Sequence, residues 1–136
     1  MEKEQLIAFE TVLPAISAFK RALGRDLSAD FVAELYAARE FNLELPSRRN
    51  QPCSDAVDSA GLRYQVKFRS PGTLNVDVNS FDFDFIVLVN VDDDYALAGL
   101  WRMDRATAEG IFVHRPDYRK WQATQVRFKG AAVRIR

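Results

Sequence analysis

A continuous apolar run in the second half of the chain places the strongest constraint on its fold. Residues Phe83 to Val91 contain the uninterrupted sequence Ile86-Val87-Leu88-Val89, which is typical of a central strand buried on both faces. Such a strand needs other layers of structure above and below it. The chain has 136 residues, of which 48% are hydrophobic, and this is enough for one domain with its own core. We therefore expect residues 1–136 to form a single domain.

Helices are predicted before this strand. An apolar stripe recurs at steps of three and four residues along the first of them: Leu6, Phe9, Leu13, Ile16 and Phe19. Pro14 lies within the stripe, so this helix either kinks there or gives way to a second one that begins near that point. Gly24 ends the pattern. Ser28 or Asp30 is expected to cap the next helix, which carries Phe31, Leu35 and Ala38 on one face.

A hairpin is predicted around Gly61. The sequence Ser59-Ala60-Gly61 fits a three-residue connection with Gly61 in the left-handed conformation. After it, apolar and polar residues alternate as far as Arg69, which is typical of a strand with one buried face. This loop pairs Val57 with Arg63 and Asp55 with Gln65. A two-residue loop would shift the pairing by one residue and turn Asp55 to the other face.

Further strands follow the hairpin. We expect an extended segment from Leu74 to Val78, the central strand, and another strand from Tyr95 to Met103. Asp104 is expected to cap a short helix that ends near Gly110, and the pattern after that is ambiguous. This order predicts an α/β (α+β) domain in which helices flank a mixed central β-sheet.

The residue types restrict the chemistry that the chain can carry out. With one cysteine, Cys53, and one histidine, His114, an internal disulfide is excluded and a zinc site of the usual Cys/His kind is not expected. The ligands of any metal would then be oxygens, which favours Mg²⁺ or Mn²⁺. No long apolar run is present, and residues 1–5 are too acidic and polar for a secretory signal, so we expect a cytoplasmic protein without a membrane partner.

Gln65 and Lys67 lie two residues apart on the polar face of the hairpin strand, and the predicted register brings Asp55 to the same face. Asp55 is the candidate anionic metal ligand, with the side-chain oxygen of Gln65 and the backbone carbonyl of Val66 beside it. Lys67 is the candidate that orients a water molecule or takes part in its deprotonation. Glu34, on the preceding helix, is a candidate second carboxylate, acting directly or through water.

The pattern of Asp, about ten residues and then Gln-X-Lys resembles the PD-(D/E)XK, or restriction-endonuclease-like, nuclease superfamily. It is most similar to the variant with Gln in place of the acidic residue, as in Mrr-type endonucleases, and the likeness runs from Glu34 to about Met103. It implies a restriction-endonuclease-like fold and a Mg²⁺-dependent nuclease that hydrolyses phosphodiester bonds in DNA. It also implies that Asp55, Gln65, Lys67 and Glu34 form the catalytic set.

The charges suggest how nucleic acid would be held. The 19 basic and 19 acidic residues balance, which argues against a protein that coats nucleic acid by bulk charge. Residues 111–136, however, hold seven basic residues and one acidic residue. The expected phosphate contacts are Arg48, Arg49, Arg63, Arg69, Arg119 and Lys120. DNA is the expected partner, with RNA or branched DNA as other substrates. A homodimer would supply a second site, and a protein partner would supply specificity.

Other interpretations fit the same residues. The polar strand face also suits an ordinary solvated face, and Glu34 equally suits a solvated helix position or a salt bridge. A catalytically inactive module of the same fold, binding nucleic acid or a protein, is the alternative function. Asp77, Asp82 and Asp84 alternate with apolar residues and are interpreted as belonging to a half-exposed strand.

Overall fold

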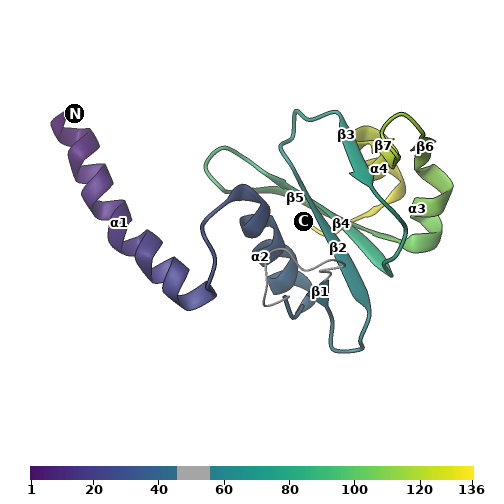
Figure 1. Cartoon of the computed structure of the whole chain (residues 1–136), viewed down its shortest axis with the longest axis horizontal. Helices are drawn as coiled ribbons and strands as arrows, with labels where there is room; N and C mark the ends of the chain where they lie inside the picture. Colours follow the sequence, from purple (N-terminus) through teal and green to yellow (C-terminus); the bar gives the residue numbers. More distant parts are fainter. Residues whose placement is uncertain (46–55) are drawn as a thin grey trace.

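The first helices are α1 (Lys3–Leu23) and α2 (Ala29–Phe41) in the computed structural model, which describes residues 1–45 and 56–136 (Figure 1). The Ser28 hydroxyl accepts a hydrogen bond from the Phe31 amide at 3.2 Å and caps α2, as predicted. Gly24 ends α1 with a φ of 68°. Because α1 continues through Pro14 as one helix, no second helix begins there.

Within the described residues, the main sheet has five strands in the order β1-β2-β4-β5-β8. β2 runs parallel to β4, whereas the other neighbours are antiparallel, so the sheet is mixed, as predicted. The strands are β1 (Ala56–Val57), β2 (Arg63–Arg69), β4 (Phe85–Val91), β5 (Leu97–Asp104) and β8 (Val133–Arg134).

A smaller antiparallel sheet forms from segments on either side of β4 and β5. Its order in the described chain is β3-β7-β6, with β3 at Asn75–Val78, β6 at Val113–Arg115 and β7 at Lys120–Thr124. Two short helices, α3 (Arg105–Ile111) and α4 (Gln125–Ala131), lie beside it (Figure 1). The Asp104 carboxylate caps α3, as predicted, by accepting from the Thr107 amide at 2.7 Å.

β4 is buried on both faces, as its apolar sequence predicts, and it separates two cores. Ile86 and Leu88 belong to the core beneath the smaller sheet, α3 and α4. Val87 and Val89 belong to the core beneath α2. All four of these β4 side chains have 0% exposure. The prediction of a mixed α+β domain whose sheet is flanked by helices is therefore confirmed.

The hairpin before β2 has the predicted loop and register. Val57 pairs with Arg63 and Ala56 pairs with Tyr64. Gly61 has a φ of 82°, and its amide donates to the Asp58 carbonyl at 3.0 Å. On the other side of β1, Val57 exchanges backbone hydrogen bonds of 2.8 and 3.1 Å with Glu44. The predicted pairing of Asp55 with Gln65 lies outside the described residues, because Asp55 is not among them.

Replacing Gly61 with alanine is expected to lower the free energy of unfolding by about 1 kcal/mol, because only glycine adopts a positive φ without steric cost. A Cβ atom at Gly61 would meet no atom within 4 Å, so the loss reports the backbone conformation alone. Urea denaturation measures the effect. Gly110, inside α3, also has open space and no positive φ. Gly110→Ala should therefore be neutral or stabilising, and equal effects of the two substitutions would contradict the assigned loop.

Candidate active site

The two faces of β2 have different surroundings. Tyr64, Val66 and Phe68 pack in the core beneath α2. Because side chains alternate along a strand, Gln65 and Lys67 point to the opposite face. They pair in register with Ile86 and Leu88 of β4, whose side chains lie beneath the smaller sheet. The structure therefore places Gln65 and Lys67 together on one face of β2, as the sequence predicts.

The backbone carbonyl of Val66 lies on the β1 edge of β2. The Leu62 carbonyl accepts from the Asp58 amide at 3.0 Å across the hairpin, whereas the Arg63 carbonyl accepts from Asp84 on the other side at 2.9 Å. Backbone groups of alternate residues in a strand face the same neighbour, so the Val66 carbonyl points to the same side as that of Leu62. This is the edge along which β1 begins at Ala56.

The other predicted residues on this part of the chain are Asp55, Arg48 and Arg49. They lie outside the described residues. Their predicted roles in metal and phosphate binding remain predictions from the sequence. Ala56, the residue after Asp55, is buried and opposite Tyr64.

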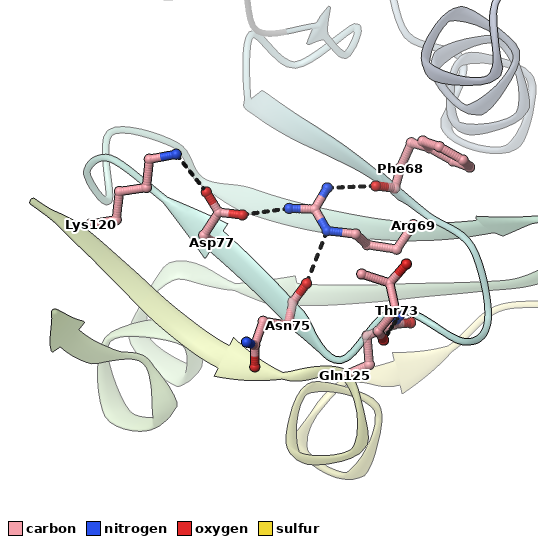
Figure 2. Close-up of polar contacts among 7 residues, drawn as sticks. All are labelled: Phe68, Arg69, Thr73, Asn75, Asp77, Lys120 and Gln125. Carbon is pink, nitrogen blue, oxygen red and sulfur yellow. Dashed lines mark hydrogen bonds and ion pairs between the residues drawn. The ribbon is translucent and has the colours of Figure 1, made fainter. Parts of the chain in front are cut away.

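A carboxylate that was expected only to lie on a half-exposed strand binds the side chain of Arg69 at the end of β2. Asp77 of β3 accepts from Arg69 at 2.5 Å and forms an ion pair with Lys120 of β7 at 3.1 Å (Figure 2). Arg69 also donates to the Asn75 carbonyl at 2.9 Å and to the Phe68 carbonyl at 2.6 Å. Arg69 thus joins the end of β2 to β3, and Asp77 joins both to β7.

The charges around Asp77 control its protonation. Burial of the Asp77 carboxyl raises its pKa, but the hydrogen bond from Lys120 and the charges of Lys67, Arg69 and Lys120 together lower that pKa below its ordinary value. Phe68 packs in the core beneath α2, so Arg69, which binds Asp77, leaves β2 on the same face as Lys67. The alternation Asn75-Val76-Asp77-Val78 indicated correctly that Asp77 points away from the core. It carried no signal of which surface β3 would cover.

Asp77→Asn is expected to lower the free energy of unfolding by about 1 kcal/mol at pH 7, because it removes a partly buried carboxylate that Arg69 and Lys120 share. A depressed pKa in the folded state gives stability above the unfolded-state pKa, and this stability is lost as the pH falls through the folded pKa. The difference between wild type and Asp77→Asn should therefore shrink below the ordinary pKa of 3.8.

Urea titrations between pH 7 and pH 2.5 measure this difference. Asp93→Asn, in the exposed turn between β4 and β5, serves as the matched control and should change stability little at any of these pH values. A loss of stability in Asp77→Asn that stays constant down to the lowest pH would contradict the assigned ion pairs.

Glu34 is held by a different contact from the one expected of a metal ligand. Its carboxylate accepts from Arg25 at 2.6 Å, and the Arg25 guanidinium lies 3.9 Å from the centre of the Phe31 ring. α2, which carries Glu34, packs on the face of the sheet opposite to Gln65 and Lys67. The structure therefore does not bring Glu34 to these two residues. Glu34 instead forms a salt bridge with Arg25, which was one of the two alternatives expected from the sequence.

The remaining predicted phosphate contacts occupy separate places. Arg63 forms an ion pair with Asp82, and its amide donates to the Asp84 carboxylate at 2.8 Å. Arg119 lies exposed in the turn between β6 and β7, with a φ of 53°. Arg69 and Lys120 are the predicted contacts that the structure brings together, through Asp77.

Within residues 1–45 and 56–136, no group of three or more His, Cys, Asp or Glu side chains is arranged to hold a metal ion. The predicted ligand set is of another kind, since it combines Asp55 with the amide oxygen of Gln65 and the carbonyl of Val66. Carboxylate, amide and carbonyl oxygens are donors that suit Mg²⁺. No helix in the described part of the chain is long and apolar enough to cross a membrane.

No protein-family model matches this chain, and no curated protein matches it.

Proposed function

We propose that this protein is a small Mg²⁺-dependent nuclease with a restriction-endonuclease-like fold, which hydrolyses phosphodiester bonds in DNA. The observation that carries the proposal is the register of the hairpin. Ala56 lies opposite Tyr64, and the pairing expected from the sequence for the preceding residue, Asp55 with Gln65, would follow directly from this register. That pairing would put Asp55 on the face of the sheet that carries Gln65 and Lys67.

In this proposal Asp55, Gln65 and the Val66 carbonyl hold the metal. Asp55 supplies the negative charge, and the two neutral oxygens complete the set that this chain offers. A bound Mg²⁺ polarises the phosphate and lowers the pKa of the attacking water. Because Lys67 follows two residues after Gln65 on the same face, its ammonium group can orient that water and offset charge on the phosphate. Glu34 is left out of the set because Arg25 binds its carboxylate.

Asp77 has a supporting part in the proposal. Arg69 and Lys120 hold the Asp77 carboxylate in position, and the charge of Lys67 contributes to the lowered pKa of that carboxyl. Two cations share this one carboxylate, so the Asp77 cluster keeps a positive excess beside the proposed site. A positive surface at this place favours the approach of a phosphate backbone.

Incubation of the purified protein with supercoiled plasmid tests the proposed function. Nicking is expected with Mg²⁺ or Mn²⁺ and not with EDTA. Single-stranded DNA, branched DNA and RNA, assayed under the same conditions, identify the preferred substrate. Absence of cleavage of all four substrates with either metal would contradict the proposed activity.

A module that keeps the fold without catalysis is the second candidate. It is favoured by the intramolecular contacts of the polar side chains, since Arg25 holds Glu34 and Asp77 holds Arg69. The neutral Gln65 also favours this candidate, because an amide oxygen binds a metal ion more weakly than a carboxylate does. Fluorescence anisotropy with labelled DNA separates the two functions. Metal-independent binding without cleavage would support the module and exclude the enzyme.

A further inference from the structure

Apart from Phe19, whose ring packs against Phe31 of α2, the apolar face of the α1 helix is not covered by any other part of the described chain. None of its residues, all of which the structure describes, is buried. The helix extends away from the sheet and α2, and only its C-terminal end approaches them (Figure 1). Seven large apolar side chains of α1 are 40–55% exposed: Leu6, Ile7, Phe9, Val12, Leu13, Ile16 and Leu23. An uncovered apolar helix of this kind is typical of a protein interface.

The spacing of these residues identifies the kind of partner. Alternate steps of three and four residues along α1 connect Leu6, Phe9, Leu13, Ile16, Lys20 and Leu23. Lys20 is the one residue of this series that is not apolar. This heptad pattern is the seam along which helices pair side by side. At 1.5 Å per residue, α1 offers a seam about 30 Å long. The partner surface that fits it is another amphipathic helix of similar length.

The charges on α1 single out a second copy of the same helix. The first half carries Glu2, Glu4, Glu10 and Lys3, a net charge of −2, whereas the last turn carries Lys20 and Arg21, a net charge of +2. An antiparallel pair sets each acidic half against the basic end of the other copy, and it also opposes the two helix dipoles. Lys20 pairs with Asp26 within its own chain, but both side chains are 65% exposed, so this contact holds Lys20 weakly.

From this charge pattern we infer that two copies of the chain dimerise through an antiparallel pair of α1 helices. Centring the pair between Leu13 and Ile16 brings Leu6 of one copy beside Leu23 of the other and Phe9 beside Lys20, so that apolar residues meet at the centre and at both ends of the seam. The first turn of each helix then reaches the end of α1 in the other copy. A cavity of about 300 Å³ lies there, lined by Phe19, Val32, Leu35, Tyr36 and Arg39. Phe19, three residues after Ile16 on α1, lines this cavity, so the cavity adjoins the apolar face of α1.

Sedimentation equilibrium of the full chain tests the pairing. Wild type is expected to be a dimer. Leu13→Glu and Ile16→Glu should each raise the dimer dissociation constant at least about 100-fold, because every substitution acts twice in a two-fold interface. Val126→Glu, at an 81% exposed apolar residue on α4, is the matched control and should leave the dimer intact. A monomeric wild type, or a dimer that persists in both α1 variants, would overturn the inference.

Two further measurements complete the test. Thermal melting should show the α1 variants folded, since α1 has no buried residue. In a Cys53→Ser background, a mixture of Leu6→Cys and Leu23→Cys chains should form crosslinked dimers on oxidation, and neither variant alone should do so. Crosslinking of Leu6→Cys with itself would indicate a parallel pair and overturn the arrangement. A monomeric chain that still nicks DNA would contradict the dimer while leaving the proposed activity in place.

Discussion

Lys67→Ala is expected to reduce metal-dependent cleavage of DNA by about 100- to 1,000-fold, because a positioned group that orients the water or stabilises charge contributes on that scale. Asp55→Asn should reduce it at least as much, since it removes the proposed anionic ligand of the metal. The two variants differ in their readouts. Lys67→Ala should retain Mn²⁺ binding in calorimetry, whereas Asp55→Asn should lose it.

Two controls make the loss of cleavage specific. Lys3→Ala removes a lysine from the exposed first turn of α1 and should cleave DNA at the wild-type rate. Thermal melting should show that Lys67→Ala and Asp55→Asn remain folded, because Lys67 is only partly buried. Cleavage that persists in both site variants would indicate that the activity does not belong to this site.

Asn90→Ala is expected to lower the free energy of unfolding by about 2–4 kcal/mol, because it leaves buried acceptors without a donor. Asn90, on β4, is 1% exposed. Its amide donates to the Gln125 side chain at 2.9 Å and to the Arg69 carbonyl at 3.0 Å. Gln125 in turn donates to the carbonyls of Ser70 and Thr73. The side chains of Asn90 and Gln125 therefore connect the turn after β2 to β4 and α4 by hydrogen bonds.

A double-mutant cycle with Gln125→Ala separates this network from simple loss of packing. The double variant should lose less free energy of unfolding than the two single variants lose together. Each single substitution already leaves the other side chain without its hydrogen-bond partner. Asn79→Ala, at an exposed position just after β3, is the matched control and should change stability by less than about 0.5 kcal/mol. Strict additivity of Asn90→Ala and Gln125→Ala would contradict the assigned network.

The central part of the fold was predictable because its signals are local. A continuous apolar run needs burial on both faces, and β4 has it. Gly61 permits one loop geometry, and the loop sets the register of β1 and β2. Alternation along β2 then assigns Gln65 and Lys67 to one face.

The end of the chain was not predictable in the same way. β6 and β8 are short and have exposed side chains, so they leave no clear pattern in the sequence. β6 takes its place by pairing with β7, and β8 takes its place by pairing with β5, which is distant in the sequence. The position of Asp77 between Arg69 and Lys120 depends on the same packing, since β3 joins a separate sheet with β7. Likewise, the stripe of α1 predicted the helix correctly without indicating what would cover it.

The most direct test of the proposed nuclease site is a crystal of the protein soaked in Mn²⁺. The anomalous signal locates the ion independently of any assay. The proposal predicts a peak between the Asp55 carboxylate and the Val66 carbonyl, with the Gln65 side-chain oxygen facing it and Lys67 beside it. A Mn²⁺ peak elsewhere, or ordered Asp55 and Gln65 side chains with no peak between them, would contradict it.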